Sequence, residues 1–153
     1  MEIERKYLLK SFPSPAVLGE GEEMCQAYMS ADEPEIRVRS KGRRSFLTIK
    51  RGSGLVRDEF ELEIPPDVFE RLLQVAVGNR IEKTRYRLDH AGLTWEIDEY
   101  RGSLAGLCVA EVELQSESQS FEIPDVLHVT ADITEDERYK NRNLAMHGAP
   151  PRA

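Results

Sequence analysis

The first residues, Met1–Leu9, read MEIERKYLL and introduce a pattern that recurs along the chain. Glu2, Glu4 and Lys6 occupy alternate positions, with the apolar Ile3 between the two acids. Because successive side chains of a strand point to opposite faces, this alternation predicts a strand with one strongly charged face. Taken alone, the stretch is typical of an ordinary surface strand that is wet on one side and packed on the other.

The same alternation recurs in further windows and changes that interpretation. Strands are predicted at residues 25–30, 35–40, 44–51, 56–64, 81–88, 93–100 and 108–115. Their charges come as pairs of one sign two residues apart, whereas a solvent-facing strand usually mixes in Ser, Thr, Asn and Gln. Gly52-Ser53-Gly54 is typical of a hairpin turn between two of these strands.

Helices are predicted between the strands. The segment PPDVFERLLQVAV (65–77) opens with prolines, repeats apolar residues at helical spacing and offers Asp67 as an N-cap. Thr134 and Glu137 have the spacing of a capping box, which predicts a helix toward Leu144. Residues 116–121 are assigned to a short helix.

Length and composition bound the class of protein. The 153 residues indicate one domain, which we place at 1–147 with a flexible tail at 148–153. The net charge of −7 argues against a general nucleic-acid binder, and no apolar run is long enough for a membrane. Cys25 and Cys108 form no CxxC motif, which favours a reduced, cytoplasmic setting, and the three histidines have no metal-ligand spacing.

The single-sign charge pairs have a clear chemical use. Same-face neighbours on a strand are roughly 6.5–7 Å apart, so paired carboxylates can reach one Mg²⁺ from the same side. Arginine and lysine rows suit phosphate oxygens. The acidic pairs are Glu2/Glu4 and Glu111/Glu113, with a third row at Glu59, Glu61 and Glu63; the basic rows are Arg37/Arg39 and Lys83/Arg85, with Lys6 and Lys50 alongside.

Two architectures fit these faces. A curled sheet would gather the charged faces into a wet tunnel around a metal-bound polyanion, with apolar faces turned outward under helices, because unpaired charges in a dry core cost too much. The simpler alternative is an open sheet whose charges form surface salt bridges.

The ordered set of motifs resembles the CYTH domains, also called triphosphate tunnel metalloenzymes, over residues 1 to about 147. The matching residues are Glu2-x-Glu4-x-Lys6, Arg37-x-Arg39, Lys50, Glu59-x-Glu61, Lys83-x-Arg85-Tyr86, Asp98, Glu111-x-Glu113 and Asp136–Asn141 (DERYKN). The resemblance implies an α+β fold with a closed antiparallel eight-stranded β tunnel, a charged interior and surrounding helices. It also implies Mg²⁺ or Mn²⁺ as cofactor, a small-molecule triphosphate as substrate and a homodimer as a compatible assembly.

Site roles follow from the charge pattern and the resemblance together. The metal ligands are expected to be Glu2, Glu4, Glu111 and Glu113. Phosphate binding is assigned to Lys6, Arg37, Arg39, Lys50, Lys83 and Arg85. The catalytic set is Lys50, Lys83, Glu59, Glu61 and Asp98, with the acids orienting water or a second metal. One departure is Ala27, in Gln26-Ala27-Tyr28-Met29, where the family often has glycine.

The expected reaction is metal-dependent hydrolysis of inorganic tripolyphosphate to pyrophosphate and phosphate. Water would be the nucleophile, because no Ser-His-Asp order or reactive-cysteine motif is present. The alternatives are an adenylate cyclase acting on ATP, a thiamine or nucleoside triphosphatase, and a non-catalytic module that binds polyphosphate or nucleotide. Retained acidic pairs argue against the last, since an anion binder gains nothing from carboxylates in its pocket.

Overall fold

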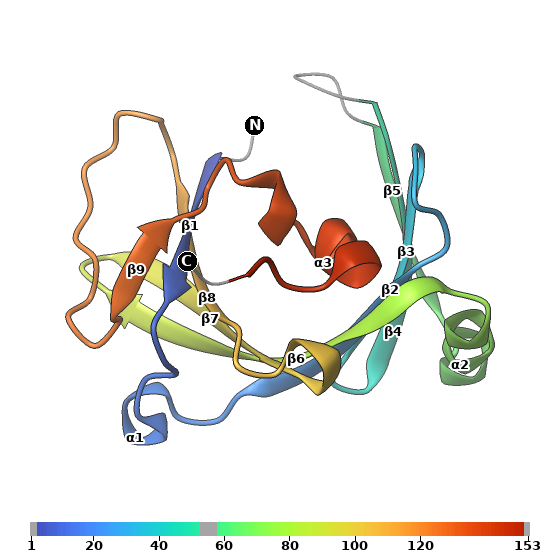
Figure 1. The fold of residues 1–153 in the computed structure, drawn as a ribbon, viewed down its shortest axis with the longest axis horizontal. Coiled ribbons are helices and arrows are strands. Elements are labelled where there is room, and N and C mark those ends of the chain that lie inside the picture. Colours follow the sequence, from blue (N-terminus) through green and yellow to red (C-terminus); the bar gives the residue numbers. More distant parts are fainter. Residues whose placement is uncertain (1–2, 53–57, 152–153) are drawn as a thin grey trace.

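A single curved antiparallel sheet forms the body of the protein in the computed structural model, which describes residues 3–52 and 58–151. The hydrogen-bonded order is β5-β4-β3-β2-β6-β7-β8-β1-β9. The sheet bends around the C-terminal segment, which lies on its concave side (Figure 1).

The strands are β1 (Ile3–Leu9), β2 (Glu22–Tyr28), β3 (Glu35–Lys41), β4 (Arg44–Arg51), β5 (Asp58–Ile64), β6 (Val77–His90), β7 (Leu93–Arg101), β8 (Cys108–Leu114) and β9 (Val129–Asp132). The helices are α1 (Pro15–Leu18), α2 (Pro66–Gln74) and α3 (Asn141–His147), with 3₁₀ turns η1 (Gly102–Leu104) and η2 (Glu137–Tyr139).

Strand register places the charged rows on the concave face. Directly paired residues share a face of the sheet. Lys6 pairs with Glu111, and Arg85 pairs with Asp98. Further pairs carry the same face across the sheet: Glu4–Glu113, Arg87–Glu96, Glu96–Glu111, Met24–Lys83, Gln26–Arg39, Arg37–Thr48, Thr48–Glu61 and Lys50–Glu59. The predicted alternation is therefore confirmed within the described residues, and the part of the predicted hairpin turn at 53–54 lies outside them.

Several predicted boundaries were wrong. Residues 116–121 form a turn and irregular chain instead of a helix. Helix α2 begins at Pro66 with Pro65 as N-cap, so Asp67 lies in its first turn. Strand β9 was not predicted at all. It is so short that its sequence shows almost no periodicity, and it pairs with β1 over only a few residues.

The late helix also differs from its prediction. Thr134 is no helix cap: its hydroxyl accepts a hydrogen bond from the Lys6 backbone N–H at 3.0 Å. The segment instead forms η2, capped by the Asp136 carboxylate, which accepts from the Arg138 backbone N–H, and then α3. The capping-box prediction was wrong because the Thr134 hydroxyl accepts the Lys6 N–H of β1 and does not cap a helix.

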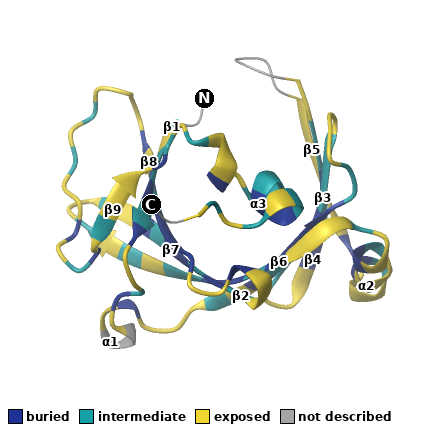
Figure 2. Cartoon of the chain, in the orientation of Figure 1, coloured by how far each residue is buried: buried dark blue, intermediate teal, exposed yellow. Residues whose placement is uncertain are grey.

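Apolar side chains cover the convex face, as the curled-sheet interpretation requires. Beneath α2, Phe69 and Leu73 pack with Val38 and Ile64. A second cluster surrounds the fully buried Trp95 and is covered by α1 and the loop before β9. Buried positions follow the sheet, and exposed ones line its edges and the outer surface of α2 (Figure 2).

Helix α3 lies on the concave side, which the sequence did not predict. Leu144 and Ala145 pack there with Tyr28 and Ile81 in a third apolar cluster. Close approach is permitted by Gly78, where an added Cβ would lie 2.7 Å from the backbone oxygen of Ala145. One end of the concave face is thus an apolar core, and the charged cavity occupies only the remainder. No helix within the described ranges is long and apolar enough to cross a membrane.

Replacing Phe69 by Ala tests whether α2 anchors the convex face. Phe69 is 4% exposed, so truncation should lower the free energy of unfolding by about 3–5 kcal/mol in a denaturant titration. Val75→Ala is the control, because Val75 is 69% exposed and should change stability by less than about 0.5 kcal/mol. Equal changes in the free energy of unfolding for the two variants would show that Phe69 does not anchor α2 to the convex face.

Candidate functional site

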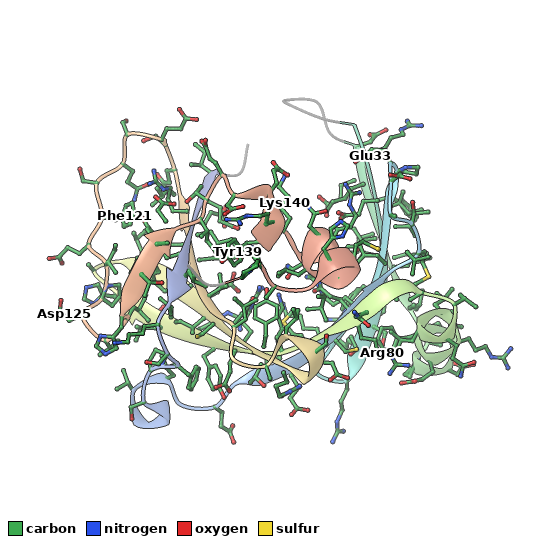
Figure 3. All side chains as sticks on the ribbon, in the orientation of Figure 1. Glu33, Arg80, Phe121, Asp125, Tyr139 and Lys140 are labelled. Atoms are coloured by element: carbon green, nitrogen blue, oxygen red, sulfur yellow. The ribbon has the colours of Figure 1, made fainter. Side chains whose placement is uncertain are left out.

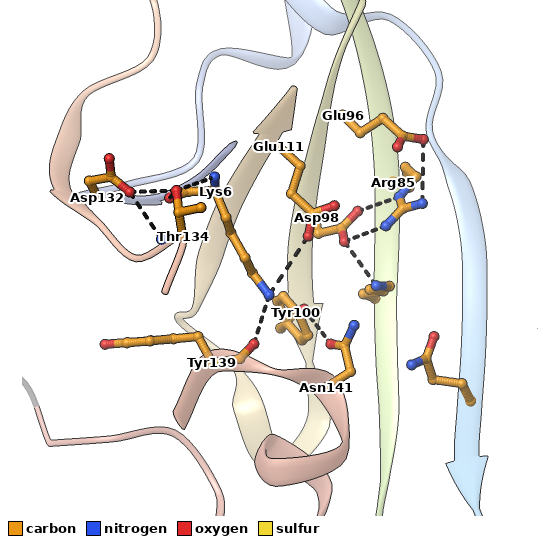
Figure 4. Close-up of polar contacts among 12 residues, drawn as sticks. Lys6, Arg85, Glu96, Asp98, Tyr100, Glu111, Asp132, Thr134, Tyr139 and Asn141 are labelled. Atoms are coloured by element: carbon orange, nitrogen blue, oxygen red, sulfur yellow. Dashed lines mark hydrogen bonds and ion pairs between the residues drawn. The ribbon is translucent and has the colours of Figure 1, made fainter. Parts of the chain in front are cut away.

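A buried carboxylate between two cations forms the centre of the concave face. Asp98 on β7 accepts hydrogen bonds from Arg85 Nε at 2.8 Å and Nη2 at 2.9 Å (Figure 4). Its Oδ2 also lies 2.9 Å from Lys83 Nζ. Lys83 and Asp98 are each 1% exposed, although charged side chains are seldom so buried. Both Asp98 oxygens are engaged, so this residue fixes its two cationic neighbours.

Electrostatics within this triad favour an ionised Asp98. Burial alone would raise the pKa of Asp98, but Lys83 and Arg85 outweigh it and hold that pKa well below its usual range. Burial lowers the pKa of Lys83, with Arg85 acting in the same direction and Asp98 opposing. The Lys83 ammonium lies beside Asp98 but makes no well-formed hydrogen bond within the described residues.

A second group lies beside the triad on β2 and β3. Gln26, fully buried, donates from Nε2 to the Tyr28 hydroxyl at 2.9 Å and accepts from Arg39 Nε at 3.2 Å. Arg37 is on the same face, and its shielded Nε has no hydrogen-bond partner among the described residues. Neither Arg37 nor Arg39 forms an ion pair within that part of the chain. Among the described residues, these guanidinium groups therefore form a cationic surface without carboxylates at ion-pair distance, although the charge of Glu61 acts on Arg39.

Carboxylates gather at the other side of the triad. Glu4, Glu96, Glu111 and Glu113 line one cavity of about 650 Å³ at the β1–β8–β7 side of the sheet. Oxygen donors of this kind match a hard divalent cation, so the residues present fit Mg²⁺ or Mn²⁺. No group of three His, Cys, Asp or Glu side chains within residues 3–52 and 58–151 is already arranged as a metal site. The fourth expected ligand, Glu2, lies outside the described residues.

The C-terminal segment reaches this site through Lys6. Lys6 Nζ donates to the backbone oxygen of Tyr139 at 2.7 Å and lies 3.7 Å from Glu111 Oε1. The Tyr100 hydroxyl donates to Asn141 Oδ1 at 2.7 Å, which ties the start of α3 to β7 (Figure 4). Tyr139 and Lys140 lie on the segment that crosses the concavity (Figure 3). The segment therefore holds a predicted phosphate-binding lysine beside a predicted metal ligand.

Three predicted residues lie farther from this centre. Lys50 on β4 pairs in register with Glu59 on β5, and Glu61 follows on the same face. Glu59 and Glu61 are exposed, because β5 is an outer strand of the sheet. They share the concave face with the triad, but no hydrogen bond or ion pair joins them to it within the described residues, so their predicted catalytic role stays a prediction.

The sequence analysis missed several polar residues of the site. Glu96 forms an ion pair with Arg85 at 3.3 Å, yet it was treated only as part of a charged strand face. Its position two residues before Asp98 on that face was the signal. Gln26 and Asn141 stand in the family-like stretches Gln26-Ala27-Tyr28-Met29 and Asp136–Asn141 but were assigned no role in the site, because an uncharged amide within a strand or loop carries no distinctive pattern.

Comparison with known proteins agrees with this geometry. The model of the CYTH domain family matches residues 1–146. The chain belongs to the CYTH domain family. An inorganic triphosphatase from Nitrosomonas europaea is 38% identical over 95% of this chain and 97% of its own. Another from Acetivibrio thermocellus is 38% identical over 94% of this chain and 92% of its own.

Solved structures extend the comparison to the fold. A crystal structure of an inorganic triphosphatase matches with a TM-score of 0.76 and 36% identity, covering 98% of this chain and 97% of that one. An adenylyl cyclase candidate from Hippeastrum with a dominant triphosphatase activity matches with a TM-score of 0.50 and 18% identity, over 76% and 80% of the two chains. The first supports the tunnel-like CYTH architecture over the whole chain, and the second shows a similar fold alone.

Replacing Asp98 by Asn should destabilise the protein strongly at neutral pH. The change leaves the buried Lys83 without its carboxylate and removes the main partner of the half-buried Arg85, which costs about 3–5 kcal/mol. Because the pKa of Asp98 is depressed by folding, its contribution is complete above the unfolded value of about 3.9 and is lost as the pH falls through the folded value.

Denaturant titrations between pH 7 and pH 3 measure that contribution. The stability difference between wild type and Asp98→Asn should be constant at neutral pH and should narrow below about pH 4. Asp125→Asn, at an exposed loop position, is the control and should show no such gap. A gap independent of pH throughout would mean that the charge of Asp98 is not what stabilises the triad.

Proposed function

We propose that this protein hydrolyses inorganic triphosphate to pyrophosphate and phosphate with the help of Mg²⁺ or Mn²⁺. The observation that carries the proposal is the distribution of charge on one concave face. A carboxylate-lined cavity lies at its β1–β8–β7 side, the Asp98 triad lies in the middle, and β3 carries two arginines that form no ion pair within the described residues. Metal-bound triphosphate has a charge distribution complementary to this face. Its cation would bind carboxylates, and its free oxygens would bind guanidinium and ammonium groups. The 38% identity to two inorganic triphosphatases supports the same substrate class.

Phosphate binding is assigned to the basic residues of this face. Arg37 and Arg39 offer planar forks for two oxygens at a time, and lysines offer point charges. The full set is Lys6, Arg37, Arg39, Lys50, Lys83 and Arg85. Lys83 and Arg85 are held in place by Asp98, so they would meet the substrate with little reorganisation.

Glu4, Glu111 and Glu113, with Glu2, would hold the divalent cation. When bound, the metal would neutralise charge on the phosphate oxygens and increase the electrophilicity of phosphorus. Glu111 is 3.7 Å from Lys6 Nζ, so the side chain that would bind metal and one that would bind phosphate are neighbours. This adjacency supports the assignment of Glu4 and Lys6, which lie on one face of β1, to a place where the metal and the phosphate that it carries would meet.

Water would be the nucleophile, attacking in line at a terminal phosphorus. Lys83 Nζ would donate to phosphate oxygens on which charge develops, and Asp98 would keep it oriented. Glu59 and Glu61 are assigned to orienting the attacking water from β5. Since phosphoryl transfer depends mostly on positioning and charge neutralisation, a rigid charged face is sufficient to supply most of the catalysis.

Phosphate release by purified protein with Mg²⁺ or Mn²⁺ tests the proposal. Tripolyphosphate should be hydrolysed faster than ATP or thiamine triphosphate, and activity should disappear on chelation of the metal. Cyclic AMP formed from ATP would favour a cyclase, and tight metal-free binding without turnover would favour a binding module. Either result would contradict the proposed reaction.

Glu111→Ala tests the assigned metal ligand. Loss of one carboxylate should lower kcat by at least about 100-fold, the scale seen when a preorganised electrostatic contact is removed. The melting temperature should change little, because Lys6 keeps its bond to the Tyr139 carbonyl. Glu117→Ala, in the exposed turn after β8, is the control. Unfolding of Glu111→Ala would identify the carboxylate as structural instead.

A further inference from the structure

Gln26 is a neutral amide on the concave face, paired in register with the cationic Arg39 on β3 and the apolar Ile81 on β6. It is fully buried on β2, and both ends of its amide are engaged. Its Nε2 donates to the Tyr28 hydroxyl at 2.9 Å, and its Oε1 accepts from Arg39 Nε at 3.2 Å. An amide held at both ends has a fixed orientation and also fixes the groups that it contacts.

Arg39 depends on this contact unusually strongly. Burial lowers the pKa of Arg39 to about 10, and the positive charges of Arg37 and Arg85 act in the same direction. In the described part of the chain, Arg39 has no carboxylate within ion-pair distance, and the Gln26 oxygen is its side-chain hydrogen-bond acceptor. Arg39 is half-buried, and a cation shielded from water without a close counter-charge is costly for the folded protein. A bound anion would offset this unfavourable free energy by supplying the missing negative charge.

We propose that Gln26 is a positioning residue that orients Arg39 for a phosphate group without neutralising it, an inference that rests on the proposed triphosphate substrate. The amide oxygen occupies the Nε–H of Arg39 and leaves the Nη groups for two phosphate oxygens. A glutamate would accept the same hydrogen bond with nearly the same shape. Its charge, however, would pair with Arg39 and compete with the substrate.

This role makes stability and binding respond in opposite directions to one substitution. Gln26→Glu supplies a counter-charge to Arg39 and Arg37, so the melting temperature should stay the same or rise. Affinity for triphosphate should fall about 10- to 100-fold, because a charge-assisted contact to phosphate is lost. If Gln26 served only packing, Gln26→Glu would lower the stability of the protein, and binding would weaken as a consequence of that loss.

The experiment measures binding separately from turnover. Tripolyphosphate affinity is measured by calorimetry without metal, and kcat, KM and melting temperature are measured with the full chain. Gln26→Met removes the acceptor without adding charge, so it should weaken binding by about three- to tenfold and lower the melting temperature. Gln74→Glu, at an exposed position on α2, makes the same change in net charge and should behave as wild type.

The outcomes separate this inference from the proposed function. A higher KM with a much smaller change in kcat for Gln26→Glu, at unchanged or increased melting temperature, supports the role of Gln26. Wild-type affinity in Gln26→Glu, or equal loss of stability in both Gln26 variants, overturns it while leaving the triphosphatase proposal standing. Failure of the wild-type protein to bind tripolyphosphate would overturn both.

Discussion

The structure depends on one electrostatic constraint: many charges of both signs must share a concave face without unfolding it. Asp98 is the residue that makes this feasible at the centre. It accepts two hydrogen bonds from Arg85 and lies 2.9 Å from the Lys83 ammonium, so a buried lysine and a half-buried arginine keep fixed positions beside a single anion. Removing one member of such a cluster destabilises the fold strongly, because the charges that remain are buried without their partner. The positions of the neighbouring strands β6 and β7 are thereby linked to the chemistry of the site.

Apolar packing supplies the stability that the charged face does not provide. Helix α2 covers the β2–β3–β4 side from outside, a cluster around Trp95 covers the β7–β8–β1 side, and α3 fills one end of the concave side. The charged cavity is therefore bounded by packed residues on several sides. Confined in this way, its side chains lose little further freedom when a ligand binds, which favours tight recognition of a small polyanion.

Charge is distributed along the concave face in a manner suited to a metal-bound substrate. Carboxylates lie at the β1–β8 side, the Asp98 triad lies in the middle, and two arginines that form no ion pair in the described part of the chain lie on β3. Lys6 joins the first region to the C-terminal segment through the Tyr139 carbonyl. A ligand with a cation at one end and free phosphate oxygens at the other would satisfy all three regions together, whereas a simple anion would satisfy only one.

The sequence by itself determined which residues face the site. Strand side chains alternate strictly, so the period-two pattern from Glu4 to Glu113 assigned the concave rows correctly, and the ordered motifs identified the CYTH family. Only the tertiary structure decided the partners. It placed α3 inside the concavity, made Thr134 a partner of β1 instead of a helix cap, and joined Gln26 to Arg39. Those outcomes depend on contacts between residues far apart in the chain, and local periodicity carries no record of which distant groups meet.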